Sequence, residues 1–203
     1  MAKVLNEQKH ETQRMCLLSH ARRLFATHGV KETSMSQVAK ACRVTKATLY
    51  HYFKGKESIL KDILACRTAE IDHLAEETDP NVSLEESFYQ FGKAHLEHIK
   101  KPENLELMKI LLSETMKNNE MRKYYMTFVQ EIIAKGAQQV LARHWKGKKP
   151  EKEMRLLFFQ FMAALLHYEW NTRMVGDLTE LVGNDETFLR QLSKTYALAA
   201  QAS

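Results

Sequence analysis

The chain has 203 residues, of which 44% are hydrophobic and 27% charged, with only seven Gly and three Pro. This composition excludes collagen-like and intrinsically disordered chains, and the length is enough to bury a sizeable core. Cys16, Cys42 and Cys66 are too widely spaced for a disulfide framework or a zinc site, so we expect a reducing compartment. A signal-peptide pattern and an apolar stretch of membrane-spanning length are both missing, so we expect a cytoplasmic protein without membrane contact.

The positive charge is concentrated in the N-terminal part. Residues 1–60 hold eleven Lys and Arg against four Glu, a net charge of +7, which leaves −2 for residues 61–203. A basic segment beside a mildly acidic remainder is typical of a surface that faces a polyanion such as nucleic acid. Chance clustering of charges on a solvated face gives the same totals, so the pattern of residues has to distinguish between these two interpretations.

Helical periodicity dominates, and no alternation of apolar and polar residues is long enough to predict a strand. The first expected helix ends at Gly29, a residue suited to close a helix in the left-handed conformation. Its apolar residues recur at helical spacing on one face: Leu17, Ala21, Leu24 and Phe25. We therefore expect an all-α protein.

Two short helices follow. Ser34 and Gln37 have the spacing of a capping box at the start of the second helix, expected over residues 35–42. Thr45 is a typical N-cap residue for the third helix, whose inward-facing residues are apolar: Leu49 and Phe53.

Longer helices make up the rest, giving about nine in all. The helix expected over residues 56–78 carries an apolar stripe that ends with Ile71 and Leu74, and it is the only continuous link that we expect between the two ends of the chain. The other expected helices cover residues 83–100, 103–117, 119–144, 150–175 and 184–202, with a loop at residues 176–183. Residues 156–168 are apolar on nearly all sides, so this helix must be covered by its own domain or by a partner subunit.

Two short helices joined by a tight turn inside a basic segment form the helix-turn-helix arrangement. The second helix presents polar side chains to base edges, and the N-terminus of the first suits a phosphate. We expect the DNA-binding residues to be Ser34, Ser36, Arg43, Thr45, Lys46, Ala47, Thr48, Tyr50, His51, Tyr52 and Lys56. Lys46 suits guanine or phosphate, Ala47 a thymine methyl group and Thr48 a base or phosphate.

Residues 12–64 closely resemble the N-terminal domain of TetR-family transcriptional repressors. The resemblance rests on LFA at residues 24–26, Gly29, TSMSQVA at 33–39, VTKATLYHYF at 44–53 and KESIL at 56–60. The chain departs from the family pattern where Cys42 and Arg43 replace a common Ala-Gly, and where Ala47 stands in place of a frequent Gly. Arg43 makes a left-handed turn less favourable by about 1 kcal/mol, but it adds a cation near the DNA.

The resemblance implies a homodimeric regulator with an N-terminal helix-turn-helix domain, expected at residues 1–55. It also implies a helical effector-binding and dimerisation domain, at residues 56–203, which dimerises through the last two long helices. Such a protein acts as a repressor at a pseudo-palindromic double-stranded DNA operator, and a small apolar or amphipathic effector releases it.

Aromatic, apolar and histidine residues of the second domain are the expected effector contacts: Phe88, Phe91, His95, Met108, Leu111, Tyr125, Phe128, Phe158, Met162, His167 and Trp170. Plain core packing explains each of them as well, so the choice between pocket and core stays open.

Two other classes of protein are alternatives. The first is an enzyme built on a helical bundle, but the sequence has no nucleophile elbow, phosphate-binding glycine loop or carboxylate–histidine metal motif. We therefore expect no enzymatic activity and no cofactor. His95 and His98 share a helix face but lack a matching third ligand, so we expect no metal. The second alternative is a DNA-binding protein that responds to no effector, which a closed cavity or a metabolite-dependent DNA affinity would exclude.

Overall fold

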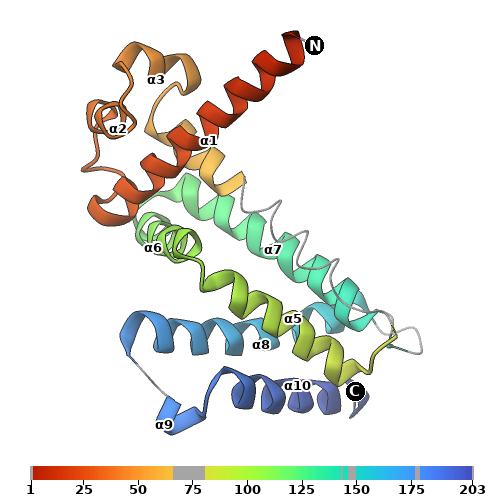
Figure 1. The fold of residues 1–203 in the computed structure, drawn as a ribbon. Coiled ribbons are helices and arrows are strands. Elements are labelled where there is room, and N and C mark those ends of the chain that lie inside the picture. The colour runs from red at the N-terminus through yellow and green to blue at the C-terminus, as the bar shows by residue number, and fades with distance from the viewer. Residues whose placement is uncertain (1, 66–80, 143, 146–149, 177–178, 203) are drawn as a thin grey trace. The chain divides into compact units, whose positions relative to one another are not determined.

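A computed structural model describes residues 2–65, 81–142, 144–145, 150–176 and 179–202, and these residues form helices and loops without a strand. In chain order the helices are α1 (Ala2–His28), α2 (Met35–Ala41), α3 (Lys46–Tyr52), an unlabelled segment at residues 56–65, α5 (Leu84–Ile99), α6 (Pro102–Lys117), α7 (Asn119–Leu141), α8 (Glu151–Trp170), η1 (Asn171–Val175), α9 (Thr179–Val182) and α10 (Asp185–Ala202) (Figure 1). The predicted all-α fold is confirmed.

The helix ends follow local capping chemistry. Gly29 adopts φ 86° directly after α1, and Ser83 accepts a hydrogen bond from the backbone N–H of Glu86 at the start of α5. The helix expected over residues 150–175 ends at Val175 as predicted, but the part beyond Trp170 is the π-helical turn η1 and not an α-helix, closed by a hydrogen bond from the Gly176 N–H to the Asn171 carbonyl. The loop expected at residues 176–183 was also partly wrong, since it contains α9.

Packing divides the chain into two compact units. Unit 1 comprises residues 1–69 and 101–125, and unit 2 comprises residues 70–100 and 126–203. The domain boundary that the sequence predicts, between residues 55 and 56, stays a prediction. The expectation that the helix over residues 56–78 is the only continuous link between the motif and the C-terminal part stays a prediction, and α7 contributes residues to both packed units. Ile71 and Leu74, the expected far end of the 56–78 stripe, lie outside the described residues, as does Cys66.

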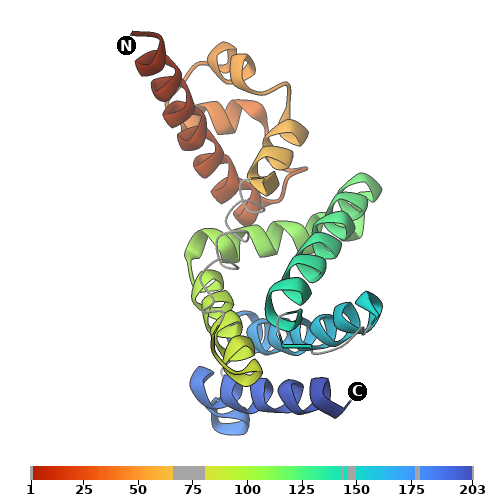
Figure 2. The same ribbon diagram turned by 90° about the vertical axis from the view of Figure 1, so that its right-hand side faces the viewer.

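Unit 1 is built around α1. Its core combines apolar residues of α1, α2, α3, segment 56–65, α6 and the start of α7, and α6 packs against the C-terminal half of α1 (Figure 2). Two partly buried ion pairs fasten this arrangement. Arg22 of α1 bonds Glu106 of α6 at 2.9 Å, and Arg14 of α1 bonds Asp62 at 2.7 Å.

Unit 2 packs α5, the second part of α7, α8 and α10 around an aromatic core. Phe88, Phe158 and Phe161 are wholly buried in it. Glycines allow the helices to approach closely, since a Cβ at Gly136 of α7 would overlap the Phe158 ring, and a Cβ at Gly92 of α5 would lie 2.7 Å from Leu189.

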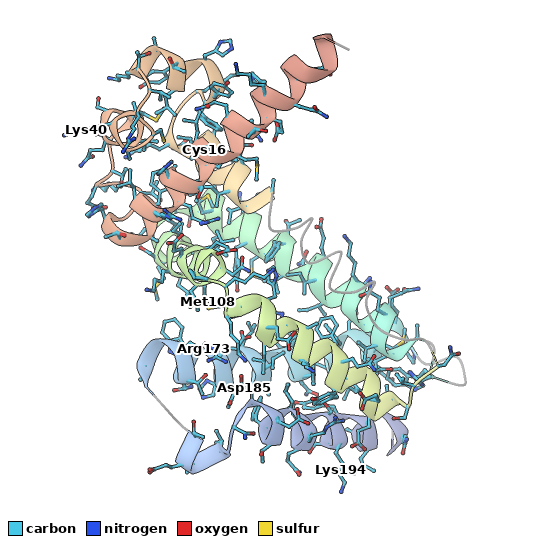
Figure 3. The ribbon with its side chains drawn as sticks, in the orientation of Figure 1. Cys16, Lys40, Met108, Arg173, Asp185 and Lys194 are labelled. Carbon is cyan, nitrogen blue, oxygen red and sulfur yellow. The ribbon has the colours of Figure 1, made fainter. Side chains whose placement is uncertain are left out.

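Asp185, the first residue of α10, joins three elements of unit 2. It accepts hydrogen bonds from Tyr168 of α8 at 2.8 Å and from Arg173 of η1 at 2.9 Å, and it pairs with Lys100 at 2.8 Å. Figure 3 shows Asp185 and Arg173 in the same part of unit 2. Burial acts to raise the pKa of Asp185, but the hydrogen bonds from Lys100 and Tyr168 and the charge of Arg173 outweigh it, so the pKa lies below its ordinary value.

The contact between α7 and α8 gives a stability prediction. Replacing Gly136 with Ala adds a methyl group where the rigid, buried Phe158 ring already lies, and overpacking of this kind costs about 1–3 kcal/mol. The higher helix propensity of Ala offsets up to about 1 kcal/mol of that cost. Gly136→Ala is therefore expected to lower the free energy of unfolding by about 1–2 kcal/mol in urea denaturation.

Gly55→Ala is the matched control, because a Cβ there meets nothing within 4 Å. We expect this variant to be neutral or slightly more stable than the wild type. A Gly136→Ala variant as stable as Gly55→Ala would contradict the close packing of α7 on α8.

Candidate nucleic-acid interface

Helices α2 and α3 form a helix-turn-helix whose caps are those that the sequence predicts. The Ser34 hydroxyl accepts from the Gln37 N–H, and the Gln37 side chain accepts from the Ser34 N–H at 2.7 Å, which completes the capping box. Thr45 caps α3 by accepting from the Thr48 N–H at 3.0 Å. The inward positions are confirmed too, since Leu49 is 0% and Phe53 2% exposed.

The turn between the two helices is a Schellman motif with an unusual residue at its left-handed position. Val44 N–H bonds the Ala39 carbonyl at 3.0 Å and Arg43 N–H bonds the Lys40 carbonyl at 3.1 Å. Arg43 adopts φ 55°, a conformation that glycine reaches without steric cost. The strain expected at Arg43 is therefore present, and its side chain is exposed.

The outer face of α3 is polar and open to solvent. Lys46, Ala47, Tyr50 and His51 are exposed, and the Lys46 ammonium lies 5.8 Å from the centre of the Tyr50 ring. The Thr48 side chain is half-buried, and its hydroxyl lies 2.8 Å from that of Thr45. This face offers a cation, a methyl group and hydroxyls on one short helix, which is the chemistry that major-groove readout requires.

The residues expected at the edges of the motif differ in what they already bind. Ser34 and Ser36 are exposed at the start of α2, and Ser34 is engaged in the capping box. Tyr52 is half-buried, and its ring stacks on His10 at 4.5 Å between centroids. The Lys56 ammonium donates to the Val30 and Lys31 carbonyls at 2.6 and 2.8 Å, so two of its three donors hold the loop after α1.

Two features of this surface were missed in the sequence. His10 lies on α1 and meets Tyr52 of α3, a contact between distant segments that no local spacing signals. Lys40 is exposed on α2 and projects from it beside the turn (Figure 3). The clustering of cations in residues 1–60 was the only signal that could have pointed to Lys40.

The expected effector residues do not all lie together. Met108, Leu111 and Tyr125 belong to unit 1, and Leu111 and Tyr125 pack with the core of that unit. The other eight belong to unit 2: Phe88, Phe91, His95, Phe128, Phe158, Met162, His167 and Trp170. Of these, the side chains of Phe88, Phe91, His95, Phe158 and Met162 are buried.

The histidines of this set differ in their surroundings. His95 is 5% exposed and faces the buried carboxylate of Glu169, a residue that the sequence pattern did not single out. His167 is exposed and lies 3.1 Å from the Asn171 amide nitrogen. Trp170, 39% exposed, also lies at the surface of the chain.

Other kinds of site find little support in the described ranges. These ranges hold no group of three or more His, Cys, Asp or Glu side chains placed to bind a metal ion. No helix within them is long and apolar enough to cross a membrane. Burial, with the nearby Cys16, raises the pKa of the Cys42 thiol to about 11, so Cys42 is not a reactive thiolate at neutral pH.

Residues 17–63, which include this helix-turn-helix, match the family model of bacterial regulatory proteins of the tetR family. The chain is also 29% identical to the HTH-type transcriptional regulator YhgD of Bacillus subtilis over 132 residues, which cover 60% of this chain and 69% of YhgD. The chain belongs to the TetR family. It is a DNA-binding transcription regulator with a helix-turn-helix motif.

Solved structures with the TetR fold align with most of the chain. A TetR-family transcriptional regulator from Mesorhizobium loti aligns with a TM-score of 0.69 and 16% identity, covering 95% of this chain and 96% of that one. NalD of Pseudomonas aeruginosa, the secondary repressor of the MexAB-OprM multidrug efflux pump, aligns with a TM-score of 0.64 and 21% identity, covering 92% and 95%. At these identities the likeness shows the fold alone.

The strained turn of this TetR-family protein gives a second prediction. Arg43→Gly is expected to raise the free energy of unfolding by about 1 kcal/mol, because glycine adopts φ 55° without strain. The same variant removes a cation beside α3, so we expect weaker binding to any duplex. A plot of the logarithm of the DNA-binding constant against the logarithm of the salt concentration should also become shallower. Its slope should fall by about 0.9 for each phosphate that the variant no longer neutralises.

Urea denaturation and fluorescence anisotropy at several salt concentrations measure the two effects. Arg43→Ala is the control, since it removes the charge but keeps a side chain at the left-handed position. It should share the weaker DNA binding without the gain in stability. Equal stabilities of the Gly and Ala variants would show that the turn stores no strain.

Proposed function

We propose that this TetR-family regulator is a homodimeric repressor that binds a pseudo-palindromic operator and is released by a small apolar or amphipathic effector. The observation that carries the proposal is the exposed polar face of α3, fixed in a segment of net charge +7 by the buried Leu49 and Phe53. A helix held in this way keeps one orientation toward the major groove.

In the proposed complex, the start of α3 reads bases. Lys46 donates to guanine or phosphate, Ala47 contacts a thymine methyl group and Thr48 bonds a base or phosphate. The residues that flank them fix the register on the DNA backbone: Ser34, Ser36, Arg43, Thr45, Tyr50, His51, Tyr52 and Lys56. The third donor of the Lys56 ammonium suffices for one phosphate contact.

A dimer explains the exposed apolar side chains of α8. Leu156, Phe159, Leu166 and Trp170 recur at helical spacing and are between 36% and 56% exposed, and Leu198 of the neighbouring α10 is 57% exposed. A stripe of large apolar side chains on one helix face is characteristic of a surface that a partner covers. In this family the partner that we propose is a second copy of the chain, bound through α8 and α10.

Substitution in this stripe tests the dimer. Phe159→Glu places two carboxylates in a symmetric apolar interface, one from each subunit, and is expected to weaken dimerisation by about 2 kcal/mol or more per site. Sedimentation velocity should then show monomer at concentrations where the wild type is dimeric.

Leu181→Glu is the matched control, because Leu181 is 80% exposed on α9 and lies outside the stripe. It should leave the oligomeric state unchanged. A Phe159→Glu protein that still sediments as a dimer would exclude α8 from the interface.

Release by an effector requires that the two packed units be coupled. Helix α7 runs without a break from unit 1 into unit 2, and α6 is tied to α1 through the Arg22–Glu106 ion pair. An effector that binds one arrangement of these helices better than another changes the spacing of the two α3 helices in a dimer. Coupling of this kind is typically about 1–3 kcal/mol, or roughly 5- to 150-fold in operator affinity.

Selection of bound duplexes from random DNA tests the operator. We expect the selected sites to have two-fold symmetry, with half-sites about 34–36 Å or a multiple apart, and affinity to fall steeply with salt. Lys46→Ala should relax the preference at one position of each half-site. Selected sites without a dyad, or a flat salt dependence, would contradict the proposal.

A further inference from the structure

Glu169 of α8 is a buried carboxylate without a hydrogen-bonding partner. Its side chain is 1% exposed, and neither carboxylate oxygen accepts a hydrogen bond from any residue that the structure describes. Buried ionisable groups in native proteins are paired, or they serve a binding or catalytic role. The bonds that Glu169 lacks therefore need a source.

His95 of α5 faces this carboxylate but does not satisfy it. Its Nε2 atom lies 3.5 Å from Oε2 of Glu169 and has no hydrogen-bond partner among the described residues. Both side chains thus point at one another from two helices of unit 2 with unused hydrogen-bonding capacity.

The cations nearest in the chain form no ion pair with Glu169 in the described part of the structure. Arg173 follows Glu169 by four residues, but its Nη2 atom donates to Asp185 at 2.9 Å, and its buried Nε atom has no hydrogen-bond partner among the described residues. Lys100 at the end of α5 also pairs with Asp185, at 2.8 Å. Within the described part of the chain, His95 is therefore the only basic residue within ion-pair distance of the Glu169 carboxylate.

Aromatic rings also lie near His95. The Phe91 ring is parallel to the imidazole with centroids 6.4 Å apart, and Phe158 meets Phe91 edge-on at 5.1 Å. Both phenylalanines are buried. A buried carboxylate and phenyl rings around one imidazole match a molecule with a cationic head and an apolar body.

We propose that Glu169 and His95 form the polar end of the effector site, where Glu169 receives the cationic nitrogen of an amphiphilic effector. This inference rests on the proposed function, because it assigns effector binding to unit 2. An ammonium group donates charge-assisted hydrogen bonds to both oxygens that now lack them. The apolar body of the effector then lies against Phe91 and Phe158.

A matched ligand series tests the site without DNA. n-Octylammonium, 1-octanol and octanoate are titrated into the full-length protein by calorimetry. The wild type is expected to bind octylammonium about tenfold or more tightly than octanol, and octanoate most weakly. Glu169→Gln should lose this preference, whereas Glu97→Gln, which removes an exposed carboxylate from α5, should keep it.

Three results of this titration overturn the proposal: no binding of octylammonium to the wild type, equal affinity for octylammonium and octanol, or a preference that survives in Glu169→Gln. The first two need only the wild-type protein, so they hold even if the variant does not fold.

A purely structural ion pair between His95 and Glu169 gives a different pattern of stability. Under the proposal, Glu169→Gln without ligand melts at the same temperature as the wild type or higher, since an unpaired buried charge is removed. Octylammonium then raises the Tm of the wild type alone. A lower Tm for the variant, with octylammonium shifting both proteins equally, would assign the pair a structural role and overturn the proposal.

Operator binding separates this inference from the function on which it rests. Octylammonium is expected to weaken wild-type binding to the selected duplex and to leave Glu169→Gln binding unchanged. If the protein binds no specific duplex, the proposed function is wrong, but the calorimetry still shows whether Glu169 binds the ammonium group. If octylammonium binds but the affinity for the duplex stays constant, the site stands and effector release fails.

Discussion

The surface that we propose faces DNA depends on how a helix of seven residues is held in place. Helix α3 is too short to be stable by its own hydrogen bonds, because isolated helices need roughly 12–15 residues even in favourable sequences. Its stability comes from the complete burial of Leu49 and Phe53 against α1, α2 and segment 56–65. The same burial directs Lys46, Ala47 and Tyr50 to solvent, so one packing interaction both folds the motif and aims it.

Helix α1 carries that constraint to the rest of unit 1. Its Arg14 bonds Asp62 and its Arg22 bonds Glu106, so the scaffold of the motif is also fastened to segment 56–65 and to α6. The Lys56 ammonium holds the loop after α1 in place by donating hydrogen bonds to two of its backbone carbonyls. Movement of α6 or of segment 56–65 therefore acts on α1 directly, and through the shared core on α3. This gives a regulator a mechanical route through the ion pairs of Arg14 and Arg22, which are not among the proposed DNA contacts.

Local chemistry was predictable from the sequence, and non-local packing was not. The caps at Ser34, Thr45 and Ser83 follow from side chains that bond N–H groups two or three residues away, and such bonds are encoded in the spacing itself. The pairing of Arg22 with Glu106 joins residues 84 positions apart, and no periodicity records it. For the same reason the sequence gives no sign that α6 packs on α1.

Helix α8 shows what hydropathy alone cannot distinguish. Its apolar residues point in two directions: Phe158, Phe161 and Leu165 lie in the core of unit 2, while Phe159 and Leu166 face outward. The polar residues within the apolar stretch, Gln160 and His167, are exposed. Glu169, which follows that stretch and resembles a solvated helix end in the sequence, points inward instead.

In stable folds the residues that are buried are normally the apolar ones, and the inward-pointing Glu169 carboxylate is an exception. Such exceptions concentrate at functional sites. A core built for stability alone would place an apolar side chain at this position, because a well-packed apolar residue replaces a buried charge without loss of stability. The charge is instead retained beside His95 and the phenyl rings of α5 and α8, with no counter-ion among the described residues other than the imidazole. Relatives that share the fold at 16–21% identity constrain neither this position nor the ligand, so the specificity of this regulator has to be sought in residues of this kind.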